Sequence, residues 1–178
     1  MSPMAWRVIT YRLPAEPSRH RVAVWRELRR LGAVALQQGT WAVPEGEPFA
    51  AGFAQVVDAI KAAGGQPVVL AVAEEDVSNS HLEELFTAQR EAEWDEFLSD
   101  CGKYETELAG EIAKGKLTLA ELDEEEQSLD RLRRWYRTIR ARDLFGAPSA
   151  PAAEHRLKEC TEALENFAEQ VYQARERP

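Results

Sequence analysis

The side chains best suited to binding a ligand are the arginines in the stretch SRHRVAVWRELRRLGA, residues 18–33. This stretch holds five arginines and a histidine, whereas the whole chain carries a formal net charge of −9. Guanidinium groups are planar, forked donors that suit phosphate, carboxylate and other oxyanions. On a helix with 100° per residue, Arg19, Arg26 and Arg30 fall within about 40° of each other, and Arg29 flanks them. The spacing therefore predicts a row of positive charge along one side of a helix.

A second basic row follows from Arg133, Arg137 and Arg140, at spacings of four and three residues. The opposite side of that helix is apolar and is interpreted as the core of a helical bundle, which argues against docking on a membrane surface. If both rows lie on one side of a dimer, they can form a groove of the size of DNA. The candidate residues for binding nucleic acid or an oxyanion are Arg12, Arg19, Arg21, Arg26, Arg29, Arg30, Arg133, Arg137 and Arg140.

The charge is distributed unevenly along the chain. Residues 1–40 contain seven arginines and two glutamates, a net charge of +5, and residues 131–145 also have a net charge of +5. Residues 74–130 contain 19 acidic and four basic side chains, a net charge of −15. These segments create local fields of opposite sign. An alternative to anion binding is therefore a protein-interaction scaffold, in which complementary charged helices pair within the fold or between subunits.

Motifs for catalysis and for metal binding are lacking. The three histidines are isolated, and there is no GxSxG sequence, Walker loop or dinucleotide-binding glycine pattern. The acidic run at residues 123–126 is interpreted as a solvated helix face, because consecutive helical residues point in different directions. Cys101 and Cys160 each lie in an apolar stripe, so small buried hydrophobic side chains are expected, with an oxidant-sensing thiol as the alternative. We expect a protein that is not an enzyme and has no metal or cofactor.

The first 76 residues are expected to form an α+β domain. Residues 6–13 combine β-branched and aromatic side chains and are typical of a strand. Ser18 is expected to cap a helix that ends at Gly32, and two short apolar runs around Gly39 predict a strand pair with a tight turn. A second apolar helix and the buried strand QPVVLAV complete the order β-α-β-β-α-β. This order is the ferredoxin-like pattern.

Residues 77–178 are expected to be a helical extension. Two sequences, Ser80-x-x-Glu83 and Thr118-x-x-Glu121, match the capping box at the start of a helix. A third helix is expected to open near Ser149, and short turns predict an antiparallel three-helix bundle or, alternatively, a dimer interface. The fold class is thus a ferredoxin-like domain followed by an antiparallel three-helix extension.

The composition and the first residues of the sequence predict the cellular compartment of this protein. Apolar residues make up 44% of the chain, which is enough for a core. No segment approaches the roughly 18 apolar residues of a membrane span, and the first residues lack the pattern of a signal peptide. Two cysteines without a CxxC pair suit a reducing compartment. We expect a cytoplasmic protein and a homodimer.

Several segments in order resemble the N-terminal region of the ChrB family of chromate-resistance regulators. They are LPAEPSRHRVAVWRELRRLGAVALQQGTWAVP, LFTAQREAEWDEFLSDC and LRRWYRTIRARDLFGAP, and the likeness runs from Trp6 to about Tyr172. The most specific parts are Arg21-Val22, Trp25-Arg26, Gly32-Ala33, Gln38-Gly39 and residues 142–147. The resemblance implies a bacterial cytoplasmic regulator of transcription that responds to chromate and controls a chromate transporter. Its expected partners are DNA or an oxyanion such as chromate.

Two features qualify this resemblance. Family members carry a further C-terminal domain that this sequence does not contain, so a stand-alone relative with a partial or different role is an open alternative. The first 75 residues are also similar to ferredoxin-like modules of small CRISPR-associated nucleases and of phenylacetate-pathway repressors. The nucleases are expected to bind metal through an aspartate at the end of the first strand. Here that strand ends at Tyr11-Arg12, which argues against nuclease activity.

Overall fold

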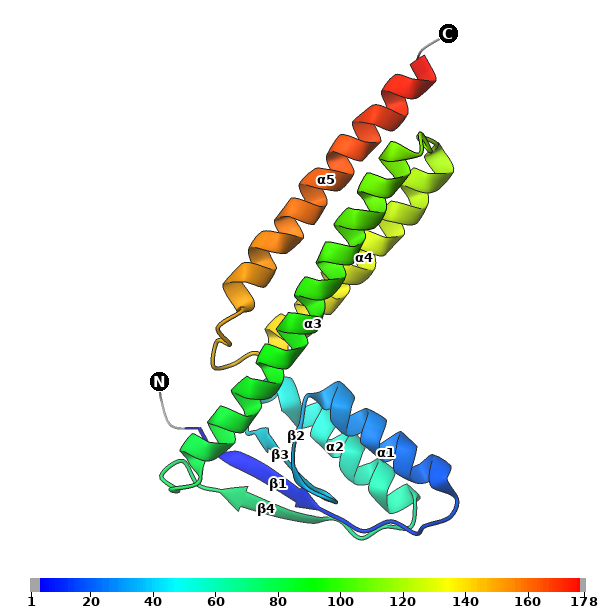
Figure 1. Ribbon diagram of the computed structural model, residues 1–178. Coiled ribbons are helices and arrows are strands. Elements are labelled where there is room, and N and C mark those ends of the chain that lie inside the picture. Colours follow the sequence, from blue (N-terminus) through cyan, green and yellow to red (C-terminus); the bar gives the residue numbers. More distant parts are fainter. Residues whose placement is uncertain (1–3, 177–178) are drawn as a thin grey trace. The chain divides into compact units, whose positions relative to one another are not determined.

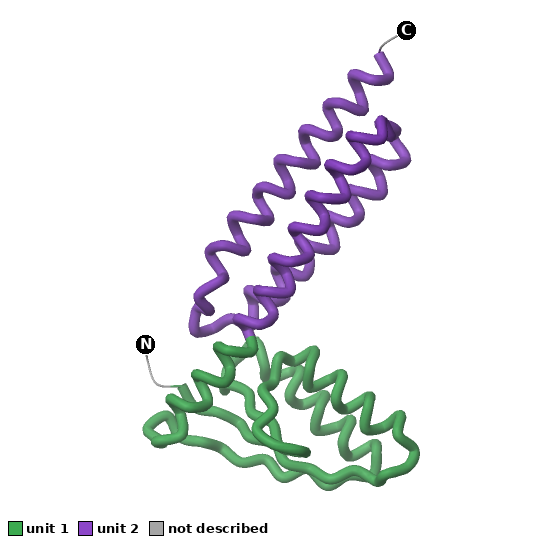
Figure 2. The backbone as a smooth tube through the Cα atoms, in the orientation of Figure 1, with its two compact units in different colours: residues 1–89 green, residues 90–178 purple. Residues whose placement is uncertain are grey.

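The computed structural model describes residues 4–176 and contains two compact units, residues 1–89 and residues 90–178 (Figure 2). The described residues form four strands and five helices, which confirms the mixed α+β class. The two units divide within helix α3, Asn79–Ala113, rather than in the loop that precedes it. The first turns of this helix therefore belong to the sheet-containing unit.

The sheet of the first unit is antiparallel throughout. It comprises β1 (Trp6–Thr10), β2 (Val34–Gln37), β3 (Thr40–Pro44) and β4 (Val68–Val72), in the order β2-β3-β1-β4. The predicted tight turn joins β2 and β3. Gly39 has φ +73° there, and a Cβ atom at this position would lie 2.6 Å from the Tyr11 carbonyl oxygen. Glycine is therefore required both by the backbone conformation and by the close approach of the chain.

Helices α1 (Ser18–Leu31) and α2 (Glu47–Ala62) lie together on one side of this sheet (Figure 1). The buried side chains of α1 are Val24, Leu28 and Leu31, spaced as one helical stripe. Burial of a single leucine such as Leu28 contributes about 2 kcal/mol. Gly32 ends α1 with φ 82°, as predicted. The prediction that Ser18 caps α1 is wrong, because Ser18 is already helical and Pro17 occupies the N-cap position.

Aromatic side chains attach the start of α3 to the sheet-containing unit. The Phe86 ring makes edge-to-face contacts with Trp6 at 5.7 Å and with Phe49 at 6.0 Å between ring centroids. Such pairs add about 1 kcal/mol to the free energy gained by burial. The predicted cap at Ser80 is wrong, since α3 begins one residue earlier, at Asn79.

The second unit contains the rest of α3 with α4 (Leu119–Arg142) and α5 (Ala150–Glu176). Successive helices run in opposite directions in Figure 1, as the short connections predict. Thr118 caps α4 by accepting a hydrogen bond of 3.2 Å from the Glu121 amide, as predicted. The largest fully buried side chains of this unit are Trp94, Arg90, Phe97, Phe167, Leu108 and Leu129. Among the described residues, no helix has the length and apolarity needed to cross a bilayer.

Candidate functional site

The arginines predicted as binding residues on α1 are all exposed. Arg19, Arg26, Arg29 and Arg30 are exposed, whereas Val24, Leu28 and Leu31 on the same helix are buried. Arg21 is exposed as well, and Arg12 is exposed in the segment that follows β1. The buried leucines and valine therefore anchor α1, and its guanidinium groups extend into solvent.

Carboxylates of the protein neutralise few of these arginines. Arg30 pairs with Glu27 on the same helix at 3.1 Å, and the Arg29 guanidinium lies over the Trp25 ring, 5.7 Å from its centroid. Within residues 4–176, no ion pair to a carboxylate involves Arg12, Arg19, Arg21 or Arg26. An isolated i,i+3 ion pair at the surface is worth less than about 1 kcal/mol, so the pair with Glu27 can exchange for a ligand.

A groove of about 790 Å³ lies beside this helix. Arg21 and Trp25 line it from α1, and Arg12 lines it from the segment after β1. The end of β2 contributes Gln37, and the turn that follows contributes Gln38. Half of the Trp25 surface is exposed, at 50%. An exposed indole beside two guanidinium groups and two amides offers a stacking surface, positive charge and hydrogen-bond donors in one place.

Two aromatic side chains, the buried Trp41 and the half-buried Tyr11, line this groove. Trp41 of β3 is nearly buried and hydrogen-bonds to the Tyr11 hydroxyl. Burial raises the pKa of Tyr11, and the hydrogen bond from Trp41 partly offsets that shift. The Tyr11 phenol therefore stays neutral and fixes the wall of the groove instead of adding negative charge.

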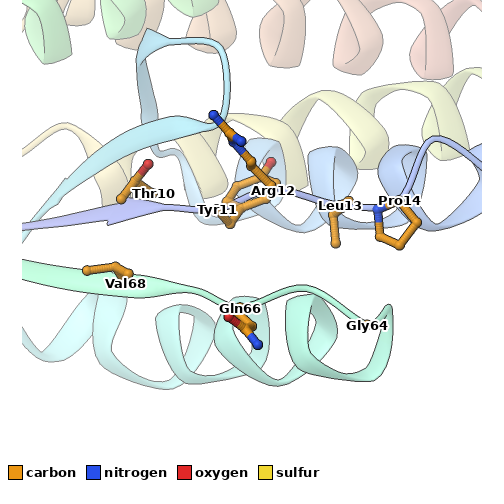
Figure 3. Close-up of a pocket in the computed structure, with 8 residues that line it drawn as sticks. All are labelled: Thr10, Tyr11, Arg12, Leu13, Pro14, Gly64, Gln66 and Val68. Atoms are coloured by element: carbon orange, nitrogen blue, oxygen red, sulfur yellow. The ribbon is translucent and has the colours of Figure 1, made fainter.

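A second hollow of about 540 Å³ shares residues 11–13 with the groove (Figure 3). It lies between the ends of β1 and β4 and includes Thr10, Gln66 and Val68. The Arg12 side chain extends away from Gln66 and Gly64 in Figure 3. Arg12 thus lines both hollows, with its guanidinium group directed away from the Gln66 side of the second one.

The predicted residues of α4 lie in the second unit and differ from each other in their contacts. Arg133 is half-buried, pairs with Asp130 at 3.2 Å and donates to the Thr161 hydroxyl at 3.5 Å. Arg140 is exposed and donates a hydrogen bond to the Tyr136 hydroxyl, and Arg137 is exposed. Arg133 is therefore the least available of these three for an external anion.

Sequence reasoning missed a charged cluster inside the helical unit. The Arg90 side chain is fully buried and bonds to Glu93 at 3.0 Å, and Glu93 also pairs with Arg142 at 3.3 Å. Asp143 accepts a hydrogen bond of 2.9 Å from the Trp94 indole. Burial lowers the pKa of Arg90 to about 10, which leaves it charged at neutral pH. One signal was present in the sequence, because Arg90 lies on the same helical stripe as buried apolar residues.

The acidic run at residues 123–126 of α4 is not a solvated helix face at every position. Asp123, Glu124 and Glu126 are exposed as expected, but Glu125 is buried, and its Oε2 atom has no hydrogen-bond partner among the described residues. No group of three metal-ligating side chains occurs in the part of the chain that the structure describes. Burial, assisted by nearby glutamates such as Glu107, raises the pKa of Glu125 from 4.5 to about 6.

This shift predicts that Glu125 weakens the fold as the pH rises. The folded state holds the proton more tightly than the unfolded state, so stability is lost between pH 4.5 and about pH 6. Glu125→Gln is expected to raise the free energy of unfolding by about 1 kcal/mol at pH 7 and to change it little at pH 4.5. Urea unfolding at both pH values measures this difference. Glu126→Gln, on an exposed residue of the same run, is the control, and an equal gain in both variants contradicts the prediction.

Comparison with protein families extends over both units. The model of the family described as "Protein ChrB, N-terminal" matches residues 21–178. This chain belongs to that family. The resemblance predicted from the sequence is confirmed, and membership of the ChrB family associates the chain with chromate resistance. Comparisons with curated proteins and with solved structures gave no match.

The ChrB match includes most of α1 and the whole helical unit. It contains Arg21 and Trp25 of the groove and also the charged cluster at Arg142 and Asp143. The segment of residues 142–147, one of the most specific parts of the resemblance, thus provides buried contacts: both Asp143 carboxylate oxygens accept from the Ala147 amide, at 2.9 and 3.1 Å.

Proposed function

We propose that this ChrB-family protein is a chromate-resistance regulator that binds DNA through the exposed arginines of α1 and the adjacent groove. The observation that carries the proposal is that Arg12, Arg19, Arg21 and Arg26 have no ion pair with a carboxylate within the described residues, in a chain of net charge −9. An acidic protein repels DNA overall, so binding requires a local positive surface of this kind.

The dimensions of α1 support a contact with the phosphate backbone. The row from Arg19 to Arg30 extends over about 16 Å of helix. Duplex DNA carries one phosphate charge per 1.7 Å of its axis, so several phosphates lie within reach of such a row. Arginine forks bind phosphate oxygens with two parallel hydrogen bonds, which favours this ligand over a monatomic anion such as chloride.

The order of elements and strands supports a ferredoxin-like interpretation of the first unit. In this arrangement α1 is fixed to the sheet through its buried side and leaves its arginine side open. A rigid helix loses little conformational entropy when it binds, so its guanidinium groups are organised before DNA arrives. We propose no catalytic step, because the contacts described above provide charge and hydrogen bonds without a nucleophile or a general base.

Gel shifts with the duplex upstream of its own gene, compared with a scrambled duplex, test the proposal. Four phosphate contacts predict that the affinity for either duplex falls about a hundredfold when salt rises from about 50 to about 200 mM. A regulator is expected to bind the upstream duplex more tightly than the scrambled one. No shift of either duplex at the lower salt concentration would refute DNA binding, and calorimetry with chromate and sulfate would then test a small oxyanion as the ligand.

A further inference from the structure

The two cysteines of the chain lie together in the core of the helical unit. Cys101 of α3 and Cys160 of α5 are 59 residues apart in sequence, and both are fully buried. The Cys160 sulfur lies 3.7 Å from the Cys101 carbonyl oxygen. A hydrogen bond between the two thiols raises the pKa of Cys101 and lowers that of Cys160. The only two cysteines of the sequence are therefore neighbours in the core, with the Cys160 sulfur against the backbone of Cys101.

A charged pair flanks these thiols. Arg156 lies one helical turn before Cys160, and Glu105 lies one turn after Cys101; the two are joined by an ion pair of 2.9 Å. Gly102 has no side chain beside Cys101, and the Arg156 Nη2 atom lies 3.7 Å from the position that a Cβ atom would take there. At Cys160 the contact with the Cys101 thiol lowers the pKa, burial and Glu105 raise it, and Arg156 offsets only part of the effect of Glu105. The contact between the thiols, rather than the charged pair, therefore favours the thiolate at Cys160 over Cys101.

We propose that Cys101 and Cys160 are a dithiol that a small peroxide oxidises to an intramolecular disulfide between α3 and α5. In the first step the Cys160 thiolate attacks one peroxide oxygen and the O–O bond breaks. With hydrogen peroxide, this gives a sulfenic acid at Cys160 and a hydroxide ion that becomes water. The Cys101 sulfur then attacks the Cys160 sulfur, an S–S bond forms, and the sulfenic oxygen leaves as a second water with the Cys101 proton. Two thiols are oxidised and one peroxide is reduced to two waters.

The sequence predicts a different role for the cysteines, that of buried hydrophobic side chains. Both roles place each cysteine in an apolar stripe, but only a dithiol requires the two residues to be neighbours in the fold. In a reducing compartment disulfides are rare, and those that form are mostly transient and sensitive to redox conditions. Because the bridge would close a long loop within one unit, the oxidised form is expected to unfold at higher urea concentration than the reduced form.

The test uses the full chain, reduced and then treated with hydrogen peroxide. After the peroxide is removed, the protein is alkylated with iodoacetamide in urea and analysed by mass spectrometry. In the expected product neither cysteine is alkylated, and the mass before alkylation is lower by two hydrogens. Digestion yields a linked Cys101–Cys160 peptide, and the protein remains a monomer on a non-reducing gel. Dithiothreitol restores both sites.

The variants separate the two steps. Cys101→Ser is expected to leave a sulfenic acid at Cys160 that dimedone labels, whereas Cys160→Ser is expected to leave Cys101 alkylatable. Circular dichroism establishes that each variant is folded. The wild-type chain tests formation of the disulfide even if a variant does not fold. The same chain oxidised in urea controls for the peroxide dose. The proposal is overturned if both thiols of the folded protein remain alkylatable at a peroxide dose that oxidises the unfolded protein. It is also overturned if the disulfide forms only between two chains.

Discussion

Arg19→Glu combined with Arg26→Glu is expected to lower the affinity for duplex DNA about a hundredfold at low salt. Each substitution removes a phosphate contact and places a carboxylate toward the DNA, and each lost contact reduces the salt slope by about 1. Both positions are exposed on α1, away from its buried side chains, and glutamate is a good helix former. The helix is therefore expected to keep its structure while its charge reverses. Gel shifts or fluorescence anisotropy at several salt concentrations measure the affinity and the slope.

The control for this double variant changes the net charge by the same amount elsewhere. Lys158→Glu with Arg175→Glu reverses two exposed charges of α5, in the helical unit. If only the total charge of the protein governed binding, both double variants would weaken it equally. That result contradicts a binding surface on α1, whereas a loss confined to the α1 variant supports it.

The groove adds the exposed Trp25 indole to the positive charge of Arg21. The groove lies beside α1 and includes Arg12 as well. If DNA enters the groove, its contacts there include the exposed indole, and stacking on such a ring is worth about 1–3 kcal/mol per base for unpaired strands. Base pairs of an intact duplex are not available for such stacking, so the phosphate contacts of the arginines remain the main source of affinity in our proposal.

Local sequence patterns determined much of the fold. The spacing of Val24, Leu28 and Leu31 predicted the buried side of α1, and Gly32 ends the helix because glycine adopts φ 82° without strain. The prediction for Thr118 was correct for a similar local reason, since its side chain needs only the amide of Glu121 three residues ahead. Ser18 and Ser80 failed as caps, because serine is common both at the cap and in the first turn. Helix starts are thus less certain than helix faces.

Contacts between distant segments were beyond what the sequence alone could predict. Two cysteines 59 residues apart meet only because α3 and α5 pack at one particular register, which no local pattern encodes. The burial of Glu125 has the same origin, since its neighbours in the acidic run are exposed. For the arginines, sequence predicts the side of the helix on which they lie, but only the fold shows which carboxylates come within reach of them.

The cluster of Arg90, Glu93, Arg142 and Asp143 illustrates how such contacts control stability. A buried guanidinium costs several kcal/mol in desolvation and is tolerated only with carboxylates nearby. Arg90 is attracted by Glu93 and Asp143 and repelled by Arg142. Asp143 has a further structural role, because it accepts hydrogen bonds from the Trp94 indole and from the amide of Ala147.

Asp143→Ala is accordingly expected to lower the free energy of unfolding by about 3–4 kcal/mol, since it leaves a buried charge less compensated and two buried donors without an acceptor. Asp130→Ala is the matched control: its carboxylate pairs with Arg133 at 3.2 Å, but 59% of its side chain is exposed, so a loss of less than about 1 kcal/mol is expected. Urea unfolding followed by circular dichroism and by tryptophan fluorescence compares the two, because Trp94 contacts Asp143 directly. Equal losses in the two variants would show that the buried cluster contributes no more than a surface ion pair. A loss confined to Asp143→Ala would instead show that the buried hydrogen bonds of Asp143 to Trp94 and Ala147 stabilise the helical unit.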